Sequence, residues 1–147
     1  MGTDRPFYER TEGRMGEVIV DLMVENRLQP EHRIVCRAMV DTGAYGLVLP
    51  SAWKRRLGKL PDLTVADLEL ADQRVVTAEI RGPARVRLGG CRAVNTDVIF
   101  VDMEPRKDGT YEPLVGDTVL QLANVVIDMR RHCLVARKRY KLKRFAA

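Results

Sequence analysis

The stretch whose residue types are best suited to chemistry is an acid on a glycine turn, Asp41-Thr42-Gly43-Ala44. An apolar run precedes it directly, and a second one follows at 47–49. A carboxylate beside an apolar interior is costly unless it is hydrogen-bonded, paired or shares a proton. Thr42 can donate and accept a hydrogen bond, and Gly43 permits a tight backbone. These residue types predict a carboxylate held on a loop at a pocket, although Asp and Gly are also common in ordinary turns.

The cysteines and histidines form no pattern that predicts a disulfide framework or a zinc site. Cys36, Cys91 and Cys133 are odd in number and widely spaced, so we expect small buried hydrophobic side chains in a reducing compartment. His32 and His132 have no close partner in the sequence, and we expect ordinary surface or turn roles for them on two strands. We expect no metal and no cofactor.

Length and composition predict one folded domain. The chain has 147 residues, of which 46% are hydrophobic, and this is enough to bury a core. No apolar run approaches the roughly 20 residues that a membrane-spanning helix needs. The N-terminus is charged and does not resemble a signal peptide. We therefore expect a soluble, cytoplasmic protein without membrane contact.

The net charge of +5 comes from the C-terminal end of the chain. From Arg130 onward there are eight Lys or Arg residues and no acid, whereas the preceding 129 residues hold 17 basic and 20 acidic residues. Six of the eight residues in 137–144 are basic, and the run includes Tyr140. A solvated tail is the ordinary interpretation. Binding of nucleic acid, with phosphate contacts and stacking on Tyr140, is the alternative.

The elements that must position the acidic loop are short strands. Alternating or β-branched apolar residues predict strands, and Ser51 with Gly58 marks the start and stop of a helix. Expected strands cover 16–24, 32–40, 46–49, 63–70, 75–81, 84–88, 93–101, 124–128 and 132–136; expected helices cover 51–58 and 119–122, the second capped by Asp117 or Thr118. This pattern predicts an all-β protein, mainly antiparallel, folded as a closed barrel or sandwich.

Three segments divide the chain. Residues 1–15 are a polar N-terminal arm, which we expect to be flexible or to order against a partner. Residues 16–136 form the domain, and 137–147 form the basic tail. Within the domain, 63–81 is expected to form a long hairpin whose tip is Ala71-Asp72-Gln73-Arg74.

Two motifs in this order resemble those of the retropepsin-like aspartic proteases. Asp41-Thr42-Gly43-Ala44 with its following apolar strand is similar to the active-site loop of that family. Leu114-Val115-Gly116, followed by a short helix and 75 residues after Asp41, is similar to its second hallmark. The resemblance covers about residues 16–136 and includes the hairpin between the motifs. The short helix after the first loop makes the chain more similar to the bacterial and cellular members than to the viral ones.

The resemblance implies a fold, a closed antiparallel barrel with one or two short helices, and an activity, aspartic endopeptidase. Family members need two facing Asp-Thr-Gly loops, and this chain has one. The implied enzyme is therefore a symmetric homodimer with Asp41 from each subunit. The dyad would share a proton and activate a water by general acid/base catalysis. Aspartic proteases are the standard example of two carboxylates that titrate as a coupled pair. Neither a metal nor a covalent intermediate is implied.

The other motif residues receive roles from the same resemblance. Thr42 would bond across the two-fold axis, Gly43 would let the loop pass close to the substrate, and Ala44 would keep the cleft floor clear. Leu114, Val115 and Gly116 would support the loop from beneath. The hairpin tip, residues 71–74, would be a flap that closes over an extended peptide or protein substrate.

The sequence also departs from the viral pattern. Asp117 stands where viral members often carry an arginine after the glycine, the hairpin tip has no glycine, and neither the arm nor the tail obviously supplies an interleaved sheet. Two other functions stay open: a non-catalytic peptide-binding module on the same fold, and a nucleic-acid-associated module that uses the basic tail.

Overall fold

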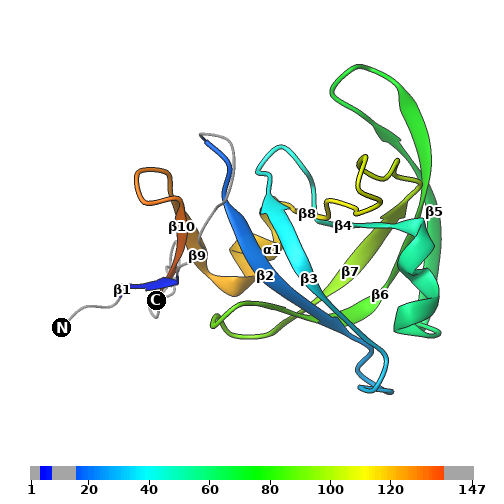
Figure 1. Ribbon diagram of the computed structural model, residues 1–147. Helices are drawn as coiled ribbons and strands as arrows, with labels where there is room; N and C mark the ends of the chain where they lie inside the picture. The colour runs from blue at the N-terminus through cyan, green and yellow to red at the C-terminus, as the bar shows by residue number, and fades with distance from the viewer. Residues whose placement is uncertain (1–3, 8–15, 138–147) are drawn as a thin grey trace, which may run out of the picture.

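The computed structural model describes residues 4–7 and 16–137, and it is built mainly of strands (Figure 1). In chain order the elements are β1 (Asp4–Phe7), β2 (Ile19–Glu25), β3 (Arg33–Val40), β4 (Leu47–Pro50), the 3₁₀ helix η1 (Ser51–Leu57), β5 (Asp62–Glu69), β6 (Val75–Leu88), β7 (Val94–Val101), β8 (Leu114–Val115), α1 (Asp117–Ala123), β9 (Val125–Asp128) and β10 (Cys133–Arg137). Within the described ranges, no helix has the length and apolar character needed to cross a membrane.

Seven strands form the larger sheet, in the order β2-β3-β8-β4-β7-β6-β5. A further pairing of β2 with β6 joins six of them in a ring, with β5 outside it. The mostly-β class is therefore confirmed, while closure into a barrel stays a prediction. Most strand pairings are antiparallel, as expected, but β3–β8 and β4–β7 are parallel. The reason is that β8 inserts between β3 and β4, and strand periodicity does not say which strands become neighbours.

The strand β6 is longer than the sequence predicts. The expected break between 75–81 and 84–88 is absent, and one strand of 14 residues runs through Gly82 and Pro83. The register against β7 shifts between Arg81 and Ala84, which absorbs the irregularity. Gly82 is required there because a Cβ atom would lie 2.4 Å from Asp97 Oδ1 and 2.9 Å from its Cα.

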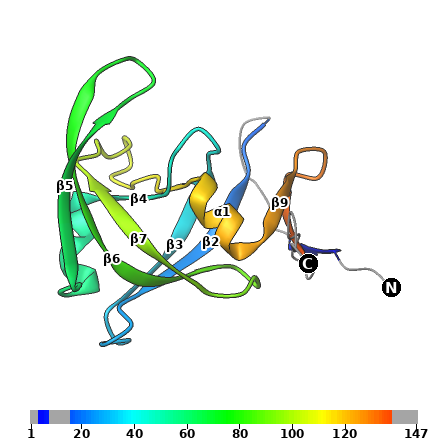
Figure 2. The same ribbon diagram turned by 180° about the vertical axis from the view of Figure 1, so that it is seen from behind.

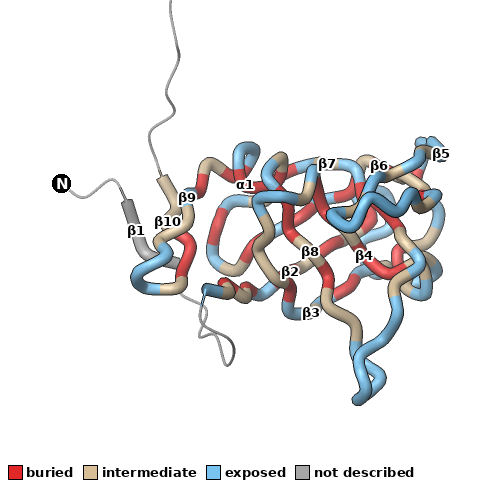
Figure 3. Tube along the Cα trace, turned by 90° about the horizontal axis from the view of Figure 1, so that it is seen from above, coloured by how far each residue is buried: buried red, intermediate tan, exposed pale blue. Residues whose placement is uncertain are grey.

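The core lies inside the ring of strands, and buried residues alternate with less buried ones along β2. Val20, Leu22 and Val24 of β2 are buried, and Phe100 of β7 is the largest fully buried side chain. Cys36 and Val40 pack on this core from β3 beside buried Ala38, as the predicted alternation requires. Figure 3 shows the buried segments gathered along the middle of the larger sheet, while β5 at its edge is largely exposed.

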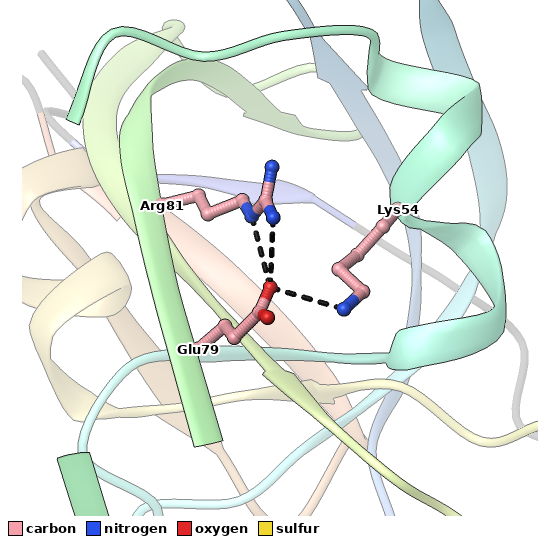
Figure 4. Close-up of polar contacts among 3 residues, drawn as sticks. All are labelled: Lys54, Glu79 and Arg81. Atoms are coloured by element: carbon pink, nitrogen blue, oxygen red, sulfur yellow. Dashed lines mark hydrogen bonds and ion pairs between the residues drawn. The ribbon is translucent and has the colours of Figure 1, made fainter. Parts of the chain in front are cut away.

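The first predicted helix is a 3₁₀ helix, η1. Gly58 ends it as expected, with φ +64° and its N–H bonded to the Arg55 carbonyl, but Ser51 makes no capping bond because the N-cap position is Pro50. Leu57 is buried and Trp53 packs on the core. Figure 4 shows how η1 is tied to β6: Glu79 Oε2 accepts from Lys54 Nζ at 3.0 Å and from Arg81 Nε at 3.0 Å.

A second sheet holds three strands in the order β1-β10-β9. The predicted hairpin over 129–131 is confirmed by β9 and β10. No strand was predicted within the polar arm, yet residues 4–7 pair antiparallel with β10, because strand pairing depends on a neighbour more than on local composition. The second helix, α1, starts after Gly116 without a side-chain cap, so the predicted capping by Asp117 or Thr118 is wrong. Figure 2 shows α1 between the larger sheet and β9.

Candidate active site

The acidic loop begins where β3 ends. The Asp41 N–H donates to the Val115 carbonyl at 2.9 Å, and the Ala44 N–H donates to the Asp41 carbonyl at 3.1 Å. Both bonds hold the loop backbone, one to β8 and one within the turn. The loop is thus a fixed turn at the end of a sheet strand.

The Asp41 carboxylate is oriented by its own loop. The Gly43 N–H donates to Asp41 Oδ1 at 2.9 Å, and a Cβ atom on Gly43 would lie 3.2 Å from that oxygen. Asp41 is half-buried, whereas Thr42 and Gly43 are exposed. One carboxylate oxygen is therefore held by a backbone donor, while the loop faces away from the core of its own chain.

Gly116 lies directly beneath this loop. Its N–H donates to the Gly46 carbonyl at 2.9 Å, and the Asp117 N–H donates to the Ala44 carbonyl at 3.0 Å. A Cβ atom on Gly116 would lie 2.4 Å from Ala44 O and 2.5 Å from Gly46 O. The position therefore has room only for a hydrogen atom.

The structure brings together the two motifs that the sequence separates by 75 residues. β8 pairs with β3 on one side, Met39 with Leu114 and Val40 with Val115, and with β4 on the other. Val115 and Gly116 are buried and Leu114 is half-buried. The start of α1 continues the support, since both the N–H and the hydroxyl of Thr118 bond to the Tyr45 carbonyl.

The predicted hairpin is present as β5 and β6, paired from Asp62–Gly82 to Glu69–Val75. In Figure 1 its tip extends beyond the body, on the same side as the loop that follows β3. The tip is a bonded turn: Leu70 N–H donates to the Arg74 carbonyl at 2.8 Å, and Arg74 Nε lies 2.6 Å from Asp72 Oδ2. Gln73 takes the left-handed position, φ +68°, that a glycine often occupies. Ala71 completes the exposed tip.

An apolar ladder, which the sequence did not single out, leads from this hairpin to the acidic loop. Ile80 pairs with Ile99 of β7, and Ile99 pairs with Val48 of β4, so the three side chains share one face of the sheet. A Cβ atom on Gly46 would lie 3.6 Å from Ile99 Cδ1, which places the ladder beside the loop. No local sequence pattern could have indicated this ladder, because its three residues come from three different strands.

The remaining candidate groups lie apart from Asp41. No group of three or more His, Cys, Asp or Glu residues suited to a metal ion occurs in the part of the chain that is described. His132 lies in a turn with φ +52° and not on a strand as expected, and its Nδ1 is 3.3 Å from the Glu17 carbonyl oxygen. His32 lies just before β3, half-buried beside Gly58. Burial raises the pKa of the Cys36 thiol to about 11 and also raises the pKa values of Cys91 and Cys133.

Comparison with known proteins identifies the family. A family model described as aspartyl protease matches residues 24–131, a span that includes both the acidic loop and the support beneath it. The chain belongs to the aspartyl protease family. No sequence among the curated proteins matches the chain.

A solved structure agrees with this assignment at the level of the fold. EIAV protease in complex with the inhibitor HBY-793 superposes with a TM-score of 0.52 at 17% sequence identity, covering 78% of this chain and 92% of that one. At this identity the similarity concerns the fold alone. Together, the family match and the fold confirm the resemblance to retropepsin-like aspartic proteases.

Proposed function

We propose that this aspartyl protease family member is an active endopeptidase that works as a symmetric homodimer, with Asp41 of each subunit forming the catalytic dyad. The observation that supports this most directly is the setting of Asp41. Its carboxylate is oriented by Gly43 N–H at 2.9 Å on a loop where Thr42 and Gly43 are exposed, and the chain has a single Asp-Thr-Gly. A second carboxylate must come from a second copy.

The chemistry follows from two carboxylates at close range. Like charges that close cannot both ionise easily, so the pair holds one proton and titrates as a unit. The ionised member takes a proton from a water molecule that attacks the peptide carbonyl, and the protonated member donates to the carbonyl oxygen. Each Asp41 can take either role because the subunits are identical.

The loop residues position this pair. Thr42 is exposed beside Asp41, where its hydroxyl can bond to the partner loop across the two-fold axis. Gly43 holds one carboxylate oxygen, and half-buried Ala44 accepts the Asp117 N–H through its carbonyl. The loop is held in position from beneath by Leu114, Val115 and Gly116, which would not contact the substrate.

The substrate is an extended peptide or protein segment. It would lie between the loop and the β5/β6 hairpin, whose tip, residues 71–74, acts as the flap that excludes water. The cross-strand pairs Leu68–Val76 and Ala66–Ala78 share the hairpin face of Ile80, because residues two apart along a strand point the same way. This apolar face favours apolar substrate side chains near the cleaved bond.

The free edge of β9 is the surface we assign to dimer formation. Among the described strands, β9 pairs with β10 alone, and Val126 and Met129 expose 39% and 53% of their surface. A strand that pairs antiparallel with its own copy generates a two-fold axis, and an unpaired edge offers its N–H and C=O groups for that pairing. Of the basic tail, 137–147, Arg137 ends β10, and residues 138–147 lie outside the described residues.

The test compares peptide cleavage by the wild type, Asp41→Asn and Asp108→Asn, with a peptide library at acid pH. Asp108 is the matched control because it lies in the reversed order Asp108-Gly109-Thr110, is exposed, and accepts the Thr110 N–H at 3.0 Å. Asp41→Asn should remove cleavage, and Asp108→Asn should retain it. Cleavage that survives Asp41→Asn would refute the protease assignment. Peptide binding by the wild type without any cleavage would favour a binding module instead.

A further inference from the structure

A surface hollow of about 410 Å³ lies apart from the acidic loop, between β3, η1 and the 102–113 loop. Its walls are Cys36, Arg37, Trp53, Arg106, Gly109, Thr110 and Tyr111. The volume is within the range of small-ligand sites, about 300–1,000 Å³. The lining combines aromatic rings with guanidinium groups, and neither the proposed chemistry nor the proposed flap uses any of these residues.

The aromatic wall of the hollow is fixed by its own contacts. Trp53 and Tyr111 meet edge to face, with ring centroids 5.9 Å apart and an interplanar angle of 82°. The guanidinium carbon of Arg56 lies 4.9 Å from the centroid of the Trp53 ring. Both arrangements are favourable, so the rings need little rearrangement to accept a ligand.

The loop wall is also pre-formed. The Arg106 N–H donates to the Thr110 carbonyl at 2.7 Å, and the Gly109 N–H donates to the Arg106 carbonyl at 2.8 Å. Thr110 donates to Asp108 Oδ1 through its hydroxyl at 2.6 Å, and the bonds from Thr110 lower the pKa of Asp108. A turn closed by these bonds loses little entropy when a ligand binds.

The charge of the hollow favours an anion. Arg106 Nη2 pairs with Glu112 at 3.1 Å, which uses only part of a donor set of five N–H groups. Arg37 contributes a second guanidinium from β3. Cys36 adds no opposing charge at neutral pH, because burial raises its pKa to about 11.

We propose that this hollow is a second binding site, for a carboxylate carried on an apolar or aromatic body. The rings of Trp53 and Tyr111 would contact the body, and Arg106 and Arg37 would bind the carboxylate, a charge-assisted contact for which the planar guanidinium is well suited. The carboxylate has two possible sources: a free small molecule, or an acidic residue in a peptide. The peptide source rests on the proposed protease function, and the small-molecule source does not.

The position of the hollow makes the peptide source geometrically reasonable. Arg37 precedes Asp41 by four residues on β3, a span of about 13 Å at the strand rise of about 3.3 Å per residue. An extended peptide rises by the same amount per residue. A peptide with an acidic side chain about four residues from the cleaved bond would match this span in length, provided that it runs along the direction of β3.

The chain supplies its own probe, since Trp53 is its single tryptophan. The full-length Asp41→Asn protein, which lacks the proposed catalytic carboxylate, is titrated while tryptophan fluorescence is recorded. The free-molecule probe is N-acetylphenylalanine, with its carboxamide as control. The peptide probe is acetyl-Leu-Glu-Leu-amide, with the Gln peptide as control. Saturable binding of either acid, at least about tenfold tighter than its neutral control, supports the site, and the acid that binds identifies the source.

The variants assign the binding to the hollow. Arg106→Gln, and independently Arg37→Gln, should weaken binding of the acid about tenfold, with unchanged circular dichroism as the check on folding. Arg85→Gln is the matched control, because Arg85 is also an arginine paired with a glutamate, Glu25, at 3.6 Å but lies outside the hollow. The proposal would be overturned by any of three results. The acid and its neutral control could give equal fluorescence changes, the titration could fail to saturate, or Arg85→Gln could weaken binding of the acid as much as Arg106→Gln does. Because the protein tested is inactive by design, a failure of this site is distinguishable from a failure of the protease assignment.

Discussion

The substitution Gly116→Ala tests whether the support beneath the acidic loop works as the geometry indicates. A Cβ atom there would lie 2.4 Å from Ala44 O, 2.5 Å from Gly46 O and 2.7 Å from Gly46 N. All three neighbours are backbone atoms, so no side chain can rotate away and the loop itself must move. The backbone of Gly116 is at φ −90°, where alanine is not strained, so the substitution probes space alone.

The expected loss of stability combines a steric clash with two weakened hydrogen bonds. Overpacking at a well-packed site costs about 1–3 kcal/mol. Moving the loop also lengthens the bonds from Gly116 N–H to Gly46 and from Asp117 N–H to Ala44, 2.9 and 3.0 Å, each worth about 1 kcal/mol. We expect the free energy of unfolding to fall by about 2–5 kcal/mol, a large part of the roughly 5–15 kcal/mol typical of a domain. Peptide cleavage should fall with it, because the carboxylate of Asp41 moves with the loop.

Urea unfolding followed by circular dichroism measures this change. Gly109→Ala is the matched control, because Gly109 has no atom within 4 Å of its Cβ position but has φ +82°. That substitution introduces backbone strain without a clash and should cost about 1–2 kcal/mol. If Gly116→Ala is no more destabilising than Gly109→Ala, the support beneath the loop is not tightly packed and the reasoning fails.

Further predictions concern the base of the β5/β6 hairpin and the proposed dimer. Glu79→Gln should lower the free energy of unfolding near neutral pH, and the difference from the wild type should shrink in acid. The reason is that the bonds from Lys54 and then Arg81 lower the pKa of Glu79. The stability that ionised Glu79 contributes is therefore present above the ordinary glutamate pKa and is lost as the pH falls through the lowered value. Urea midpoints measured from pH 7 to pH 3 check this, and a difference independent of pH would contradict it. Val126→Lys, which places a charge on β9 beside the edge that no described strand covers, should shift sedimentation towards the monomer and lower cleavage at low protein concentration. Unchanged sedimentation would exclude β9 as the interface. Exposed Val35 of β3 gives the matched control, Val35→Lys.

The parts of this molecule that could be predicted from sequence are those governed by local rules. The alternation along β2 and β3, the glycine stop at Gly58 and the final hairpin depend on residues a few positions apart. The acidic motif and the Leu114-Val115-Gly116 motif were also readable, because each combines unusual residue types in a fixed order. Their spatial contact was inferred from family resemblance and is seen in the bond from Asp41 N–H to the Val115 carbonyl.

The parts that escaped prediction depend on neighbours distant in sequence. β1 forms because β10 is present to pair with it, and no local pattern in residues 4–7 requires a strand. β6 runs through Gly82 and Pro83 because β7 lies beside it and the register shift absorbs the irregularity. The apolar ladder of Ile80, Ile99 and Val48 joins three strands, and the aromatic hollow joins β3, η1 and a loop. Both arise from topology, which residue periodicity does not encode.

The geometry around Asp41 is itself an argument for a two-fold axis. Two bonds orient or brace the Asp41 carboxylate, from Gly43 N–H to Asp41 Oδ1 and from Asp41 N–H to the Val115 carbonyl. Neither provides a group that could exchange a proton with it. Activation of water at a peptide bond needs a base and an acid at the same moment, and one carboxylate can be only one of these at a time. A carboxylate fixed in direction on such a loop is half of the proposed dyad, and in the proposed homodimer an identical loop related by symmetry would supply the second carboxylate.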